Sequence, residues 1–223
     1  MKVSFLDLKV NNQKFRSKIL RKINNILLSG KILDGKDQKM FEKKISRFVS
    51  SKYAVGVSSG SSALLLALKA NDIGIGDEVI TTPFTWIITS HAIASAGAKP
   101  VFVDIDDNFN LDPYNIEKAI NKKTKAIVPM HVAGKLCDMK HINSIAKKYN
   151  LKIIEDAAQS ICSSYSGKKS GHYSNACAFS FNPMKVLNTY GEAGAVSTNS
   201  KKVFKKLIQL RHAGTIRKKN SFD

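Results

Sequence analysis

The chain has 223 residues, of which 43% are hydrophobic, and these values are typical of a globular protein with a core and argue against a disordered one. Its 36 Lys and Arg against 17 Asp and Glu give a formal net charge of +19. Because the lysines are spread through helical segments with few aromatic residues between them, the charge favours a solvated basic surface over a nucleic-acid binding site.

The predicted elements alternate between helices and short apolar strands. Helices are expected at about 12–28 and 38–50, the second with an apolar face made of Phe41, Ile45, Phe48 and Val49. Segments rich in Val, Ile and Phe predict strands at 53–57, 77–82, 99–104, 125–130, 151–156, 177–181 and 193–198. Helical stretches separate most of these strands, so we expect a three-layer α/β sandwich with a mostly parallel mixed sheet. The short connection between the last two strands permits one antiparallel pair.

No linker interrupts the chain, so residues 1–223 are expected to form one domain that opens with a helical segment at about 1–50. The most apolar window, 80–98, is broken by a proline, a histidine and several hydroxyl residues. Neither a membrane span nor an export signal is therefore expected.

The three cysteines, Cys137, Cys162 and Cys177, lie far apart and form no C-x-x-C pair. This spacing predicts neither a disulfide framework nor a zinc or other metal site. It fits a protein of the reducing cytoplasm.

Ligands bind at the carboxyl ends of the strands in an open α/β sheet, and four segments there carry candidate functional residues. The first is VGVSSGSSALLLALKA at 55–70, which turns from a strand through Gly60 and Ser61 into a helix. N–H groups and hydroxyls at a helix N-terminus suit a phosphate group. Serine is also a preferred helix cap, so both interpretations stay open.

The second segment is IIEDAAQS at 153–160, where Asp156 ends a strand and Gln159 follows. A carboxylate shielded from water can hold a proton on a basic ring nitrogen, because opposite charges favour each other's charged form. Helix capping by Asp156 is the alternative.

The third segment is TTPFTWII at 81–88, in which Trp86 follows a strand and a proline-containing turn. A lone tryptophan usually fills a core. At a strand end its indole face can also stack on a flat aromatic ligand.

The fourth segment is CAFSFNPMKVLNTYGEAGAV at 177–196, in which Lys185 stands between a buried strand and a glycine-containing turn. Its neighbours are apolar: Phe179, Phe181, Pro183, Met184, Val186 and Leu187. Apolar surroundings disfavour the ammonium form, which makes an amine nucleophilic enough for a Schiff base. A lysine that extends its amine to solvent is the alternative.

Together the four segments describe a ligand with a flat ring, a phosphate, a basic ring nitrogen and an aldehyde. These are the features of pyridoxal 5'-phosphate (PLP), whose usual protein partners are a lysine and an acidic residue. The chain presents the phosphate loop, the aromatic residue, the aspartate and the lysine in that order.

On these residues the chain resembles the fold type I PLP-dependent aminotransferases that act on nucleotide-linked keto sugars, the DegT/StrS group. The resemblance covers nearly the whole chain, through FLDLKVNNQKF, SGKILDGKDQKMFEKKISRF, YAVGVSSGSSALLLAL, GIGDEVITTPFTW, GAKPVFVDID, KTKAIVPMHVAG, IIEDAAQS, FSFNPMKVLNTYGEAGAV and LRHAG. Such an ordered series is more specific than any single motif. It implies the fold of an aspartate aminotransferase-like large domain.

The resemblance also implies roles for residues near the ring. Lys185 would form the Schiff base with PLP and later carry the proton between the substrate carbon and the C4' carbon. Asp156 would pair with the pyridine nitrogen and keep it protonated. Gln159 would lie near the ring hydroxyl, and Trp86 against the ring face.

Gly60, Ser61 and Ser180 would hold the phosphate. The loop reads S-S-G-S where the group usually has S-S-G-T, and Ser61 keeps the hydroxyl. Further along, Ala193 stands where the group usually has glycine, which is expected to alter a close approach of the backbone. A branch with histidine in place of the lysine performs dehydration, and Lys185 argues against that branch.

Members of the group continue well beyond LRHAG into a small C-terminal domain, which the resemblance implies is absent from residues 1–223. That domain and a partner subunit would close the site, so a homodimer is expected once the C-terminal part is supplied.

The expected function is transfer of an amino group from an amino acid, with glutamate the expected donor, to a keto sugar nucleotide in cell-surface polysaccharide biosynthesis. One alternative is a catalytically inactive or truncated PLP-fold protein with a regulatory or assembly role. The other is a basic nucleic-acid binder.

Overall fold

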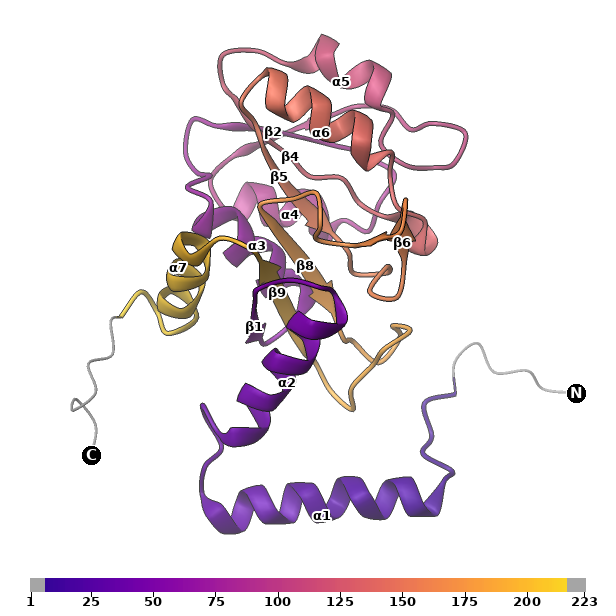
Figure 1. Ribbon diagram of the computed structural model, residues 1–223, viewed down its shortest axis with the longest axis vertical. Helices are drawn as coiled ribbons and strands as arrows, with labels where there is room; N and C mark the ends of the chain where they lie inside the picture. Colours follow the sequence, from indigo (N-terminus) through magenta and orange to yellow (C-terminus); the bar gives the residue numbers. More distant parts are fainter. Residues whose placement is uncertain (1–6, 216–223) are drawn as a thin grey trace, which may run out of the picture. The chain divides into compact units, whose positions relative to one another are not determined.

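The computed structural model describes residues 7–215, and the chain divides into two compact units, Met1–Phe41 and Glu42–Asp223. Helices, a large mixed sheet and a small hairpin make up the described part (Figure 1). None of the helices within residues 7–215 is long and apolar enough to cross a membrane.

The first unit contains α1 (Gln13–Ser29) and the start of α2 (Lys36–Phe48). The helix α1 begins because the Asn12 side chain accepts a hydrogen bond from the N–H of Phe15, and it ends at Gly30 with a left-handed φ of 64°. Both predicted N-terminal helices are confirmed, with ends shifted by one or two residues.

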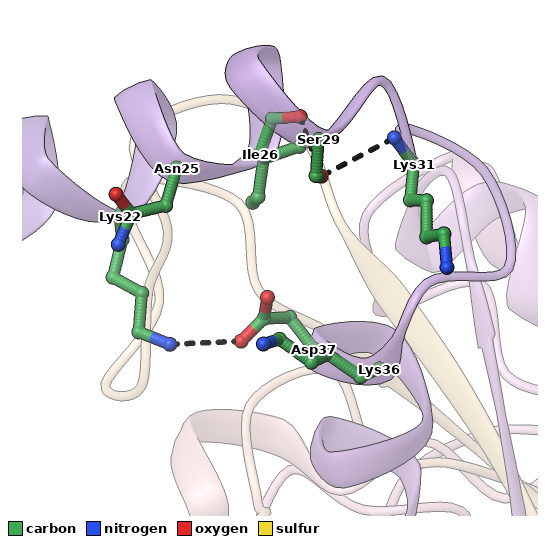
Figure 2. Close-up of a pocket in the computed structure, with 7 residues that line it drawn as sticks. All are labelled: Lys22, Asn25, Ile26, Ser29, Lys31, Lys36 and Asp37. Atoms are coloured by element: carbon green, nitrogen blue, oxygen red, sulfur yellow. Dashed lines mark hydrogen bonds and ion pairs between the residues drawn. The ribbon is translucent and has the colours of Figure 1, made fainter.

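A small hollow of about 100 Å³ lies between α1 and the start of α2 (Figure 2). Lys22 Nζ is 3.0 Å from Asp37 Oδ1, and Ser29 Oγ accepts a hydrogen bond from the N–H of Lys31. The Lys22 side chain is 62% exposed, so its ion pair with Asp37 contributes little to stability.

The seven predicted strands are all present in the second unit. They are β1 (Tyr53–Val57), β2 (Glu78–Thr81), β3 (Lys99–Phe102), β4 (Thr124–Ile127), β5 (Lys152–Asp156), β8 (Ala176–Ser180) and β9 (Gly194–Thr198). They form one sheet in the order β1-β9-β8-β5-β4-β2-β3. The pairs from β8 to β3 are parallel, and β9 runs antiparallel to both β8 and β1. The expected antiparallel pair is confirmed, whereas the hairpin of β6 (Ser164–Tyr165) and β7 (Lys168–Lys169) was not predicted.

Helices cover both faces of this sheet, which confirms the three-layer α/β architecture. The helices α3 (Gly60–Ala70), α4 (Ile88–Ser95) and α7 (Lys201–Arg211) share one apolar core, and α5 (Pro113–Ala119) and α6 (Met139–Lys148) share another. Consecutive strand residues divide between the two cores: Val79 and Ile154 belong to the first, Ile80 and Ile153 to the second. Successive strand side chains point to opposite faces, so strands buried on both faces appear as continuous apolar runs.

The strand directions place five chain segments at one edge of the sheet. The strands β4, β5 and β8 end there, β9 starts there, and β1 ends there because it runs parallel to β8. The turn into α3, the segment after Asp156, and the loop between β8 and β9 therefore meet at this edge.

A buried ion pair joins α2, β1 and α7 on the periphery of the sheet. Arg211 Nη1 lies 2.5 Å from Glu42 Oε1 and 3.2 Å from the carbonyl oxygen of Gly56, and the N–H of Gly56 donates to the same Glu42 oxygen at 2.9 Å. Both charged side chains are only 16% exposed.

Replacing Arg211 with Met is expected to lower the free energy of unfolding by about 1–3 kcal/mol, because it removes a charge-assisted bond from a largely buried carboxylate. Urea denaturation measures the change. Lys201→Met, at the exposed start of the same helix, is the control and should shift stability by less than about 0.5 kcal/mol. Equal effects of the two substitutions would show that the ion pair does not stabilise the fold.

Candidate active site

A cavity of about 510 Å³ opens at the sheet edge where the strands end. All seven residues singled out in the sequence line it: Gly60, Ser61, Trp86, Asp156, Gln159, Ser180 and Lys185. They come from segments up to 125 positions apart in the chain, and the parallel strand order brings them together.

The turn into α3 contributes backbone groups to the cavity. Ser59 caps the helix, since its Oγ accepts a hydrogen bond from the N–H of Ser62 at 3.1 Å and its carbonyl accepts one from Ala63 at 3.0 Å. The capping interpretation is therefore correct for Ser59. The N–H groups of Gly60 and Ser61 lie in the first helical turn, where no carbonyl of the same helix can accept from them, so they are available to an anion.

Close packing of this turn against β8 and β9 explains its glycine. A Cβ atom on Gly60 would lie 2.6 Å from Cβ of Ser180, so any larger residue would displace the turn from the strand. The N–H groups of α3 and the hydroxyl of Ser180 therefore border the same corner of the cavity.

Asp156 is a buried carboxylate at the bottom of the cavity, 4% exposed. Burial raises the pKa of its carboxyl above the ordinary value, whereas hydrogen bonds from the Thr89 hydroxyl at 2.7 Å and the Ala158 N–H at 3.1 Å oppose that shift. The positive charges of His131 and Lys185 also lower the pKa of this carboxyl. Asp156 thus caps the short turn that follows β5 and faces a site with room for a cationic partner.

Gln159 is held from the side by the short helix η1 (Val132–Gly134). Its Oε1 accepts a hydrogen bond from the N–H of Ala133 at 2.7 Å, and Ala133 has a left-handed φ of 50°. This bond fixes the orientation of the amide, because only one end of the side chain is an acceptor.

Trp86 lines the cavity with 71% of its surface exposed. The alternative that it fills the core is therefore wrong. An exposed indole beside a cavity can cover a planar ligand.

Lys185 lines the cavity from the loop between β8 and β9, where its N–H donates to the carbonyl of Asn182 at 2.9 Å. The expected apolar enclosure of this lysine is wrong. Met184 and Val186 are 63% and 82% exposed, because the chain leaves the sheet after Phe181 and turns these side chains outward. Phe179 and Phe181 are buried in the body of the protein.

The expectation that Ala193 alters a close approach of the backbone is also wrong. Ala193 does not adopt a positive φ, and its carbonyl accepts a hydrogen bond from the N–H of Phe181 at 2.8 Å. The close approach falls on the next residue, Gly194, whose Cβ would lie 2.2 Å from the carbonyl oxygen of Ser59.

Sequence reasoning missed several polar residues of the cavity. Thr89 is 1% exposed, bonds Asp156 and lies 3.0 Å from the Thr85 hydroxyl, and Glu192 accepts a hydrogen bond from Asn182 at the side near Lys185. Thr89 lies in the first turn of α4, three positions after Trp86, and this place at the start of a helix is the signal that could have indicated it. Within residues 7–215, no group of three or more His, Cys, Asp and Glu side chains is placed to hold a metal ion.

Comparison with known proteins gives a consistent result. A profile of the DegT/DnrJ/EryC1/StrS aminotransferase family matches residues 13–222. The chain is 43% identical over 217 residues to a dTDP-3-amino-3,6-dideoxy-alpha-D-galactopyranose transaminase of Aneurinibacillus thermoaerophilus, covering 97% of this chain and 60% of the relative. It is 42% identical to a pleiotropic regulatory protein of Geobacillus stearothermophilus, covering 96% and 58%.

Among solved structures, NtdA of Bacillus subtilis with the bound cofactor PMP superimposes with a TM-score of 0.87 at 37% identity, over 93% of this chain and 47% of that one. The chain thus spans about 60% of the length of the two curated relatives.

Proposed function

Because the chain belongs to the DegT/DnrJ/EryC1/StrS aminotransferase family, we propose that it carries the cofactor site of a PLP-dependent sugar aminotransferase. The whole enzyme would move an amino group from an amino acid, glutamate, to a keto sugar nucleotide used for amino-sugar and cell-surface polysaccharide synthesis. We propose that it works as a homodimer. Unpaired Cys137, Cys162 and Cys177 suit a cytoplasmic location.

The observation that supports this function best is one cavity that contains both Lys185 and the buried Asp156. Burial raises the pKa of the Asp156 carboxyl, which means that its ionised form is unfavourable in the empty cavity. A cationic partner within the cavity would stabilise that ionised form. A protonated pyridine nitrogen is such a partner.

The other groups of the cavity fit the remaining parts of PLP. The N–H groups of Gly60 and Ser61 and the hydroxyl of Ser180 border one corner and suit the phosphate. The indole of Trp86 is suited to cover the face of the PLP ring, and the amide of Gln159 is suited to contact the edge of the ring.

PLP supplies an aldehyde that takes up an amino group and a ring that accepts an electron pair. Lys185 would hold the cofactor in its resting state and then act as the base and acid that moves a proton at the reacting carbon. Asp156 would hold the proton on the ring nitrogen, and the Thr89 hydroxyl would keep the carboxylate pointing at it. Trp86 would exclude water from the ring.

Incubating the purified protein with PLP, reducing with borohydride and mapping the modified peptide tests the proposal. The label is expected on Lys185 and is expected to disappear in Lys185→Ala. Lys201→Ala, at an exposed position away from the cavity, is the control and should keep the label. A label on another lysine, or none, would overturn the site assignment.

A regulatory role is the second candidate, and the name of the Geobacillus stearothermophilus relative favours it. Adding glutamate to the PLP-loaded protein separates the two. An aminotransferase converts bound PLP to PMP, which changes the absorbance spectrum, whereas a regulator that only binds PLP leaves the spectrum unchanged.

A further inference from the structure

Two acidic residues stand next to each other at the end of β5, and only one of them faces the cavity. Asp156 lines the cavity, whereas Glu155 is fully buried and does not line it. Consecutive strand residues point to opposite faces of a sheet, so the carboxylate of Glu155 lies behind that of Asp156. The function proposed above gives Glu155 no role.

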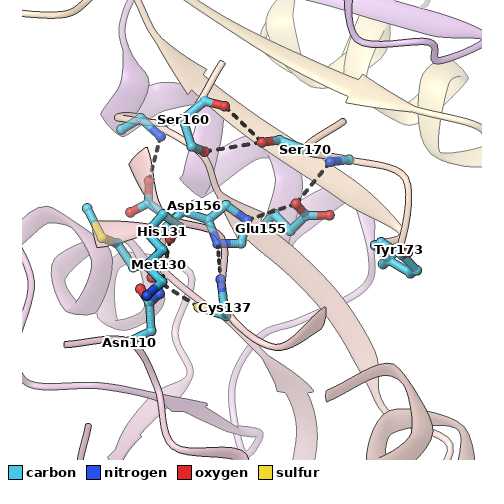
Figure 3. A network of polar contacts seen from close by, with 12 residues as sticks. Asn110, Met130, His131, Cys137, Glu155, Asp156, Ser160, Ser170 and Tyr173 are labelled. Atoms are coloured by element: carbon cyan, nitrogen blue, oxygen red, sulfur yellow. Dashed lines mark hydrogen bonds and ion pairs between the residues drawn. The ribbon is translucent and has the colours of Figure 1, made fainter. Parts of the chain in front are cut away.

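Glu155 is bound by groups from two distant segments, which Figure 3 shows as a network of polar contacts. Its Oε2 accepts hydrogen bonds from Nε2 of His131 and from the N–H of Gly171, both at 2.9 Å, and its Oε1 has no hydrogen-bond partner among the described residues. Gly171 has a φ of 91°, and a Cβ there would meet Cβ of Cys177 at 3.1 Å. A side chain at position 171 would therefore crowd Cys177, and glycine is the residue that lets this backbone N–H reach Glu155.

His131 joins this network directly to Asp156. Its main-chain N–H donates to the carbonyl of Asp156 at 3.1 Å, and the N–H of Asp156 donates to Pro129 at 2.9 Å. The ring of His131 is fully buried and reaches Glu155 on the other face. One residue thus holds the end of β5 by its backbone and by its side chain.

Two effects act on the charge of this ring. Burial lowers the pKa of His131, whereas the side chains of Cys137 and Glu155 raise it, to about 10. One contact opposes protonation of the ring. Its Nδ1 accepts a hydrogen bond from the main-chain N–H of Cys137 at 3.3 Å, and a second proton on the ring would displace that bond. The charged or titratable groups around the ring are Glu155, Asp156 and Cys137.

The segment that follows Asp156 is held by the same network. Ser170, next to Gly171, donates through Oγ to the carbonyl of Ser160 at 2.9 Å, and the N–H of Ser160 donates to Ala157 at 3.1 Å. This short turn contains Ala158, which donates to the Asp156 carboxylate. Movement of Glu155 would therefore move both the backbone and a hydrogen-bond donor of Asp156.

We propose that His131 is a positioning residue for Asp156, acting through its ring hydrogen bond to Glu155. This inference rests on the proposed function, since Asp156 serves PLP only if PLP binds in the cavity. A displaced carboxylate binds the ring nitrogen less well, so loss of the His131–Glu155 bond weakens PLP binding to folded protein.

Three variants separate hydrogen bonding from charge. His131→Gln places an amide nitrogen near the Nε2 position, keeps the bond to Glu155 and cannot be charged. His131→Asn places its amide near Nδ1 and loses the bond. Glu155→Gln keeps an acceptor oxygen for His131 and Gly171 but removes the negative charge.

The Kd of PLP is measured by absorbance titration, together with the free energy of unfolding in urea. His131→Asn is expected to raise the Kd about tenfold or more, the range typical of groups that orient a ligand-binding side chain. His131→Gln and Glu155→Gln are expected to stay within about threefold of the unchanged protein. Arg211→Met, which weakens the fold away from the cavity, should leave the Kd unchanged.

An unchanged Kd in folded His131→Asn would overturn the inference, because His131 would then serve stability alone. A tenfold rise in His131→Gln or Glu155→Gln would also overturn it, because charge and not the hydrogen bond would be responsible. If His131→Asn does not fold, Glu155→Ala, which removes the same hydrogen bond from the other side, is measured in its place. A protein with unchanged sequence that takes up no PLP would overturn the proposed function as well.

Discussion

Replacing Asp156 with Asn is expected to stabilise the cofactor-free protein and to weaken PLP binding by about a hundredfold or more. The carboxylate of Asp156 is buried, and that burial raises its pKa, so its ionised form is unfavourable until a cation binds. Asparagine removes the charge while keeping the shape. Removing this unfavourable buried charge should raise the free energy of unfolding of the cofactor-free protein.

The polar neighbours of Asp156 can accommodate an amide in place of the carboxylate. The amide oxygen of the introduced side chain would accept from the N–H of Ala158, and its NH₂ group would donate to the Thr89 hydroxyl. Thr89 can then donate to the hydroxyl of Thr85, which lies 3.0 Å away. Both hydrogen bonds of the carboxylate are thereby replaced, and the second N–H of the amide would face the cavity, so the substitution should not carry the usual cost of a broken hydrogen bond.

The stabilisation should depend on pH in a defined direction. A folded-state pKa above the unfolded value of 3.8 means that the folded protein holds the proton more tightly. Stability of the unchanged protein therefore falls as pH rises from about 4 through the raised pKa. Melting curves should show the advantage of Asp156→Asn at neutral pH and its disappearance below about pH 4.

Asp107→Asn, at an exposed position, is the control and should change neither melting temperature nor PLP binding. A lower melting temperature for Asp156→Asn at neutral pH would contradict an unfavourable buried charge. Unchanged PLP affinity would contradict the assignment of Asp156 to the ring nitrogen.

Replacing Gly194 with Ala is expected to destabilise the fold by about 4 kcal/mol or more and to disrupt the phosphate corner of the cavity. The added Cβ would lie 2.2 Å from the carbonyl oxygen and 2.4 Å from the carbonyl carbon of Ser59. Both contacts are with backbone, so no side-chain rotation relieves them. Either β9 or the start of α3 must move.

This movement would reach the proposed phosphate ligands, because Gly194 pairs with Val57 on β1 and with Ser180 on β8. Circular dichroism melting and PLP titration measure the two effects. The matched control is Ala193→Gly one position earlier, where φ is not positive. It should cost about 1 kcal/mol or less. Similar effects at both positions would show that the contact with Ser59 is not the cause.

The order of elements could be predicted from the sequence because each strand is buried on both faces. Such strands appear as short apolar runs, and all seven runs became strands within three residues of their predicted ends. The hairpin β6–β7 escaped prediction because its strands are two residues long and half exposed, so no apolar pattern indicates them.

Seven of the residues that line the cavity were also visible in the sequence, since each ends or follows a strand or opens a helix. The surroundings of these residues could not be predicted from the sequence. Apolar neighbours of Lys185 in the sequence predicted an enclosed amine, yet Met184 and Val186 point outward, because neighbours in a loop need not be neighbours in space.

Local patterns determined the fold class and the strand positions and, together with the family resemblance, seven of the residues that line the cavity, because periodic burial and turn chemistry act over a few positions. Only the tertiary structure decided that Gly194 approaches Ser59, that Thr89 bonds Asp156, and that His131 reaches Glu155. These contacts join residues 24 to 135 positions apart. The packing of strands and helices creates them, and no local pattern contains that information.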